Sequence, residues 1–129
     1  MKFFFDNCVS PKLARALGVL TSEHEIVHLR ERFDVGTADE TWLPAIAQSG
    51  CHVVTTDRRI YANAEQRKLL RQANLVAFFL ARSFECEGKW RQAELLMKYW
   101  PNILDCAARV KPGDCWLLQL NGKMEAGRQ

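Results

Sequence analysis

Short apolar runs alternate with longer stretches of helical periodicity along this chain. The apolar runs occupy residues 2–5, 25–29, 51–56, 75–80 and 115–120. Stretches with apolar residues three and four positions apart lie between them, at 11–17, 37–50, 63–72 and 88–109. This alternation is typical of βαβ units, and the unbroken run at 75–80 indicates a strand buried on both faces. The pattern predicts an α/β fold with a mostly parallel central sheet.

The start of the second helix is open to two interpretations. Thr37 and Glu40 have the spacing of a capping box, in which the glutamate side chain reaches back to the cap. Pro44 would then lie beyond the first turn, where a proline removes a helical hydrogen bond. We therefore expect either a kink at Pro44 or a later start of the helix.

Length and composition are those of an ordinary globular protein. The 129 residues predict one domain over 1–120, followed by a flexible C-terminal tail at 121–129. Hydrophobic residues make up 48% and charged residues 26%, which excludes a disordered or collagen-like chain. The net charge of +3 permits nucleic-acid binding without favouring it. Five cysteines without a Cys-x-x-Cys pair are interpreted as small buried residues in a reducing compartment.

The sequence carries no signal for a membrane or for export. No apolar stretch approaches the length of a membrane-spanning helix. The N-terminus lacks the apolar core and the cleavage site of a signal peptide. We therefore expect a cytoplasmic protein that does not act at a membrane.

Two aspartates follow predicted strands directly, Asp6 at the first and Asp57 at the third. Ligands of open α/β sheets bind outside the carboxyl ends of the strands, so these side chains are expected to converge. Asp39 begins the helix that leads toward the Asp57 strand, and it is expected at the same edge. Three carboxylates there would repel one another, and a cation such as Mg²⁺ would relieve the repulsion. Each aspartate has an alternative role as a turn former, and Glu40 is the second-choice ligand.

The middle of the chain is locally basic. Its arginines and lysine are Arg30, Arg32, Arg58, Arg59, Arg67, Lys68 and Arg71. These residues form either a solvated helix face or a surface that contacts the phosphate backbone of a nucleic acid beside the acidic residues.

The long helix over 88–109 carries large apolar side chains on one face. Trp90, Met97 and Trp100 recur at helical spacing along it. That face either covers the core or forms a surface for a partner, including a second copy of the chain in a homodimer.

Three segments together resemble the PIN domain. They are the hydrophobic strand ending in Asp6, the stretch from Asp39 through Ile46-Ala47 to Gly50, and Val53-Val54-Thr55-Thr56-Asp57-Arg58. The similarity covers roughly residues 1–80 and is closest to the compact PIN-like group allied to VapC-type toxins. It implies a three-layer α/β/α sandwich and a ribonuclease that depends on Mg²⁺ or Mn²⁺ and is silenced by a protein antitoxin.

The same resemblance implies roles for individual residues. Asp6, Asp39 and Asp57 match the catalytic, metal-binding acids. If the protein is such a ribonuclease, we expect RNA contacts from Arg58, Arg59, Arg30 and Arg32. Two features depart from the pattern. Classical PIN domains carry a further glutamate on a helix between the first two aspartates, and this chain has no clear equivalent. Compact relatives often carry an acid directly after the first aspartate, and here that residue is Asn7. These departures leave open a catalytically weak PIN-like module that binds RNA or a protein.

A third, less favoured interpretation is a receiver domain, which accepts phosphate on an aspartate. Asp6, Asp57 and Lys111-Pro112 imitate the acids and the Lys-Pro of that family. In receivers the Lys-Pro follows a buried strand, whereas here it follows a predicted helix.

Overall fold

The structure is a computed structural model that describes residues 1–34, 36–47, 51–57 and 63–127. Its strands are β1 (Lys2–Phe5), β2 (Glu25–His28), β3 (His52–Thr55), β4 (Val76–Leu80), β5 (Cys115–Leu118) and β6 (Met124–Ala126). Its α-helices are α1 (Pro11–Leu20), α2 (Asp39–Ala47), α4 (Ala64–Gln72) and α5 (Lys89–Ala107), and the short 3₁₀ helices are η1 (Leu29–Glu31) and η2 (Arg82–Phe84).

The strands form one sheet in the order β2-β1-β3-β4-β5-β6. Neighbouring strands are parallel from β2 to β5, and β6 is antiparallel to β5. The prediction of an α/β fold with a mostly parallel sheet is confirmed. β1 lies between β2 and β3, so the chain reverses its direction of travel across the sheet at β1.

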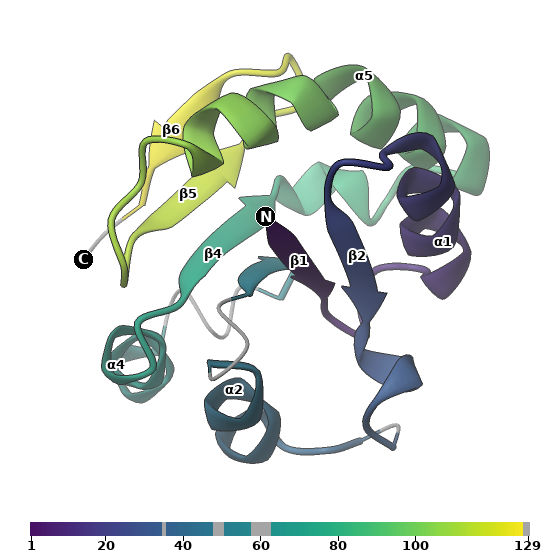
Figure 1. The fold of residues 1–129 in the computed structure, drawn as a ribbon. Coiled ribbons are helices and arrows are strands. Elements are labelled where there is room, and N and C mark those ends of the chain that lie inside the picture. Colours follow the sequence, from purple (N-terminus) through teal and green to yellow (C-terminus); the bar gives the residue numbers. More distant parts are fainter. Residues whose placement is uncertain (35, 48–50, 58–62, 128–129) are drawn as a thin grey trace.

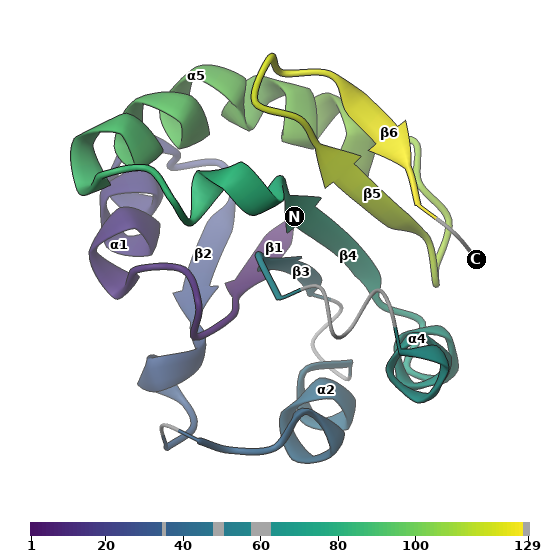
Figure 2. The same ribbon diagram turned by 180° about the vertical axis from the view of Figure 1, so that it is seen from behind.

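Helices cover both faces of this sheet and make three layers (Figure 1). On one face, Phe3 and Phe5 of β1 belong to the core cluster with α1 and α5. On the other, Phe4 belongs to the cluster with α2 and α4, and its ring stacks on Trp42 at 5.6 Å. Figure 2 shows the same layers from behind. Because side chains alternate along a strand, the aromatic run of β1 supplies both cores at once.

The predicted apolar face of α5 divides between the core and the surface. Trp100 is buried, with its ring 4.8 Å from that of Phe3. Met97 is partly buried against the same core. Trp90, at the start of the helix, is 79% exposed. Packing therefore accounts for Trp100 and Met97, while Trp90 alone of the three lies at the surface.

The expectation of a flexible tail at 121–129 is wrong for the segment that forms β6. A turn after β5 returns the chain, and Leu117 pairs with Glu125. Gly122 occupies this turn with φ of +89°, a conformation that glycine adopts without strain. A three-residue strand with one partly buried and two exposed residues has too little alternation to be recognised from sequence.

The five cysteines lie in the described part of the chain and form no disulfide there, and only some of them are buried. Cys51, Cys106 and Cys115 are core residues, as predicted, but Cys8 and Cys86 are exposed. None of the helices in the described part of the chain is long and apolar enough to cross a membrane.

Candidate active site

Asp6 and Asp57 leave the sheet from neighbouring strands at the same edge. Phe5 pairs with Val54, and the backbone N–H of Asp6 donates to the Val54 carbonyl at 2.9 Å. Asp57 follows the end of β3 by two residues. The chain continues from β1 to β2 on one side and later places β3 on the other side of β1, so the switch point of the sheet lies between β1 and β3. Such switch points are the usual ligand sites of open α/β sheets. The structure thus brings the two predicted aspartates together.

Thr55 connects the two aspartates. Its buried hydroxyl donates to Asp6 Oδ2 at 2.8 Å and accepts the backbone N–H of Asp57 at 2.9 Å. Asp6 Oδ1 accepts a second bond, from the backbone N–H of Asn7 at 2.6 Å. Each oxygen of the Asp6 carboxylate therefore accepts a hydrogen bond, and a carboxylate oxygen has a second lone pair that can take another ligand. The apolar pattern of the sequence identifies Thr55 only as a strand residue. The one sequence signal for its role is that a hydroxyl side chain ends an apolar strand two residues before Asp57.

The Asp6 carboxyl is in an unfavourable place for a negative charge. Asp6 is only 6% exposed. Burial raises the pKa of its carboxyl above the ordinary 3.8, and the negative charge of Asp57 adds to the rise. Hydrogen bonds from Thr55, Asn7 and Cys8 lower the pKa and partly offset this rise. No ion pair within the described residues involves Asp6. A cation bound beside Asp6 would relieve this charge.

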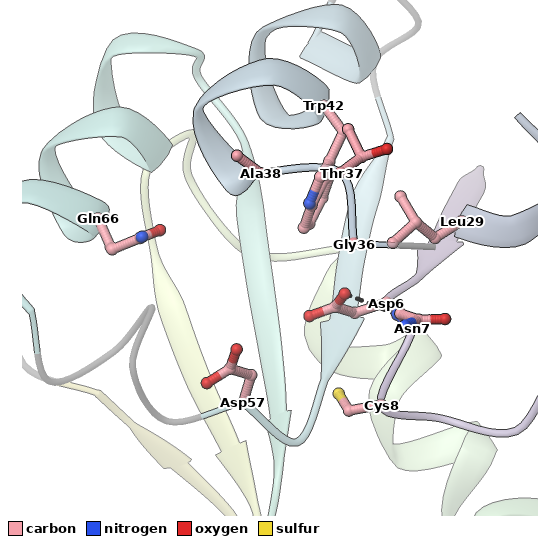
Figure 3. Close-up of a pocket in the computed structure, with 10 residues that line it drawn as sticks. All are labelled: Asp6, Asn7, Cys8, Leu29, Gly36, Thr37, Ala38, Trp42, Asp57 and Gln66. Carbon is pink, nitrogen blue, oxygen red and sulfur yellow. Dashed lines mark hydrogen bonds between the residues drawn. The ribbon is translucent and has the colours of Figure 1, made fainter. Parts of the chain in front are cut away.

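The two carboxylates line one pocket of about 480 Å³ (Figure 3). It is lined by Asp6, Asn7, Cys8, Leu29, Gly36, Thr37, Ala38, Trp42, Asp57 and Gln66. Figure 3 shows the Gln66 carboxamide extending from α4 toward this space. Its Oε1 is buried and has no hydrogen-bond partner within the described part of the chain. A buried acceptor of this kind calls for a ligand or a water molecule, and neither charge nor periodicity in the sequence indicated Gln66.

Cys8 adds a thiol to the same hydrogen-bond network. Its Sγ accepts the backbone N–H of Thr56 at 3.2 Å and lies 3.3 Å from Oγ1 of Thr55. Although Cys8 as a whole is exposed, desolvation of its sulfur against Thr55 and Thr56 raises the pKa of the thiol above 9.0, and the charge of Asp6 raises it further. The thiol therefore stays protonated at neutral pH and is a poor nucleophile.

The helix that carries Asp39 starts at the pocket. α2 begins at Asp39, one residue later than a cap at Thr37 predicts, and this small shift does not move Pro44 into the first turn. The Ala38 carbonyl accepts the backbone N–H of Thr41 at 2.9 Å, while the Thr37 hydroxyl donates to the Asp34 carbonyl at 2.6 Å. Pro44 lies inside the helix.

For Asp39, the third predicted carboxylate, the structure describes the backbone but not the side chain. Thr37 and Ala38, which precede Asp39, both line the pocket. The side chains of Asp39 and of Glu40 lie outside the described residues. Within the described part of the chain, no three His, Cys, Asp or Glu side chains form a group that could hold a metal ion.

The predicted RNA-binding arginines divide into two groups. Arg58 and Arg59 lie outside the described residues. Arg30 and Arg32 are exposed and lie at and just after η1, beyond the carboxyl end of β2. Arg30 Nε donates to Oδ1 of Asn7 at 2.6 Å, which places Arg30 beside the pocket.

The receiver arrangement is not formed. Lys111 and Pro112 lie between α5 and β5, and the next residue, Gly113, donates its N–H to the carbonyl of Leu75, just before β4. They are therefore at the amino ends of the strands, at the opposite edge from Asp6 and Asp57. A lysine at that edge is out of reach of a phosphate held by either aspartate.

Comparison with known proteins identifies the family. Residues 1–82 match the family described as the PIN-like domain, which is more than half of the 129 residues. No curated protein and no solved structure matches the chain significantly. The matched segment contains both aspartates, Thr55 and the start of α2. PIN-like domains are commonly nucleases and have the α/β/α fold seen here. The chain therefore belongs to the PIN-like domain family.

Proposed function

We propose that this protein is a metal-dependent endoribonuclease of PIN type that hydrolyses RNA phosphodiesters. The observation that carries the proposal is the pairing of Asp6 and Asp57 at one pocket at the switch point of the sheet. Asp6 is buried, and its negative charge and that of Asp57 repel each other, so the pocket favours a cation. A buried hydroxyl holds the Asp6 carboxylate in position.

The donor atoms at this pocket fit Mg²⁺ or Mn²⁺. Both are cations that prefer oxygen ligands, and Mg²⁺ keeps several waters when one or two carboxylates bind it. Asp6 and Asp57 would supply carboxylate oxygens, with Asp39 as the proposed third acid and Glu40 as its second choice. The unpartnered Oε1 of Gln66 would accept a hydrogen bond from water in the same pocket.

In the proposed hydrolysis, different residues would bind the metal, position a carboxylate and contact the RNA. A divalent cation, when bound, makes water a better nucleophile and stabilises charge on the phosphoryl oxygens. Asp6 and Asp57 would hold that cation, and the hydrogen bond from Thr55 positions the Asp6 carboxylate at the pocket. Arg58 and Arg59 are proposed to contact the RNA backbone, where cations position a nucleic acid without reading its sequence.

We further propose that the protein is the toxin of a toxin–antitoxin pair. The support is the likeness of its motifs to those of VapC-type proteins. Expression of the wild type should arrest growth, and expression of Asp57→Asn should not. Co-expression of a small protein encoded beside it should restore growth if that protein is the antitoxin. Unimpeded growth on expression of soluble, folded wild type would refute the toxin role alone.

The nuclease is tested by cleavage of a mixed pool of single-stranded RNA in Mn²⁺, with a chelator as the blank. Asp57→Asn should reduce the rate by several orders of magnitude, because it removes a negative charge from the metal site. Asp105→Asn is the matched control, since Asp105 is exposed on α5 on the other face of the sheet. Equal metal-dependent rates in wild type and Asp57→Asn would remove Asp57 from the site.

A catalytically weak module that binds RNA or a protein is the second candidate. Asn7, at a position that is often acidic in compact relatives, favours it, because a neutral side chain adds no charge to hold a cation. Such a module would retain RNA affinity in Asp57→Asn and would cleave RNA in neither form. Cleavage by the wild type alone decides for the enzyme.

A further inference from the structure

Asn7 joins the acidic pocket to an arginine through two hydrogen bonds. Its backbone N–H donates to Asp6 Oδ1 at 2.6 Å. Its side-chain Oδ1 accepts from Nε of Arg30, also at 2.6 Å. The guanidinium of Arg30 is therefore held one residue away from the carboxylate of Asp6. Because Asn7 and Leu29 both line the pocket, Arg30 stands at its rim.

The backbone of Arg30 is held as firmly as its side chain. Its N–H donates to Nδ1 of His28 at 3.1 Å, and Nε2 of His28 bonds the carbonyl of Val9 at 2.6 Å. A histidine that accepts at Nδ1 and donates at Nε2 is neutral, so its tautomer is set by these two partners. His28 is fully buried at the end of β2. This ring ties the turn that carries Arg30 to the loop after Asp6.

The bond to Asn7 anchors Arg30 without placing it in an ion pair. Asn7 is neutral, and no ion pair within the described part of the chain includes Arg30. A guanidinium has five N–H donors, and the bond to Asn7 uses only the one on Nε. The two terminal amino groups remain, and Arg30 is exposed to solvent. An acid in place of Asn7 would instead neutralise the guanidinium by an ion pair.

We propose that Arg30 binds a phosphate of the RNA backbone at the rim of the pocket, with Asn7 as its positioning residue. The inference rests on the proposed nuclease function. An arginine that is already anchored loses less side-chain freedom when it takes up a phosphate, and its planar fork matches phosphate oxygens. Arg32 lies two residues away and is also exposed, but no hydrogen bond within the described residues anchors its side chain. The two arginines should therefore differ in what they contribute.

Binding of a fluorescently labelled single-stranded RNA provides the test, with Ca²⁺ in place of Mn²⁺ to limit cleavage. Arg30→Gln should weaken binding about tenfold and should reduce the slope of log K against log salt by about 0.7 to 1. Arg32→Gln, the matched control, should change affinity less than twofold and leave the slope nearly unchanged. Both side chains are exposed, so equal melting temperatures will show that the fold is intact.

Asn7→Asp tests the positioning role. The new carboxylate should pair with Arg30 and lower RNA affinity as much as Arg30→Gln does. It should also strengthen Mn²⁺ binding, an effect that general damage to the fold would not produce. If Arg30→Gln and Arg32→Gln bind RNA alike while the wild type binds and cleaves, the Arg30 inference is overturned and the nuclease stands. A wild type that neither binds nor cleaves RNA overturns both.

Discussion

The hydroxyl of Thr55 donates to the Asp6 carboxylate at 2.8 Å across neighbouring strands. This bond exists because β1 and β3 pair in a register that sets Asp6 beside Thr55. The same hydroxyl accepts the backbone N–H of Asp57, so one buried group fixes both the Asp6 side chain and the start of the loop after β3. The geometry of the acidic pair thus depends on a neutral residue.

Removing the Thr55 hydroxyl should loosen the site and destabilise the protein. Thr55→Val keeps the shape of the side chain but leaves Asp6 Oδ2 and the Asp57 N–H without this partner. Losing buried hydrogen bonds of this kind costs on the order of 1–3 kcal/mol in unfolding free energy. Urea denaturation should show this loss. Thr55→Ser, which keeps the hydroxyl, should lose less than half as much, and equal stability of the valine variant and wild type would contradict the role.

Asp6→Asn should stabilise the protein in a chelating buffer. The pKa of Asp6 is raised in the native state, so the native state holds its proton more readily than the unfolded chain does. Stability therefore falls as the pH rises from the ordinary 3.8 through the native pKa, and the charged form is the less stable one at neutral pH. We expect the melting temperature of Asp6→Asn to rise by roughly 2–5 °C, the shift that about 1 kcal/mol produces. Asp105→Asn should leave it unchanged.

Mn²⁺ should raise the melting temperature of the wild type. A ligand that binds only the native state stabilises it by about 2.7 kcal/mol at one hundred times its dissociation constant. Asp6→Asn and Asp57→Asn should each lose most of this rise, because each removes a charged oxygen ligand. Differential scanning fluorimetry over a Mn²⁺ titration measures it. A full rise in both variants would place the metal elsewhere.

Acid should destabilise the protein through His28. Burial lowers the pKa of His28 below the ordinary 6.5, Arg30 lowers it further, and the Val9 carbonyl, Glu31 and Asp6 oppose the shift. The contribution of neutral His28 is fully present above pH 6.5 and is lost as the pH falls toward the lowered native pKa.

The measurement is the melting temperature between about pH 7.5 and 5. His28→Gln should flatten the decline seen in the wild type. His52 is shifted in the same direction by burial, so part of the decline should remain in His28→Gln. His24→Gln is the control, because His24 is only partly buried and contacts the chain terminus. A profile of His28→Gln that matches the wild type would exclude His28 as the group responsible.

Much of the fold was readable from local pattern. Apolar runs located β1 to β5 to within a few residues, because strands of a sheet covered on both faces are rich in apolar residues. Asn63 caps α4 and Ser10 caps α1 through side-chain bonds to backbone N–H groups two residues on, as local capping rules predict. Asp6 and Asp57 stood out for the same reason: each is a polar residue at the end of an apolar run.

The strand order and the hydrogen bonds of the site were decided by the tertiary structure. Nothing local in the sequence requires β1 to lie between β2 and β3, yet that order makes the switch point where the aspartates meet. Thr55 meets Asp6, and Asn7 meets Arg30, across 49 and 23 positions of sequence. Such contacts depend on the pairing register and on loop conformation, which arise from long-range packing. Periodicity therefore predicted which acids end the strands, whereas packing selected the neutral residues that hold them and the arginine beside them.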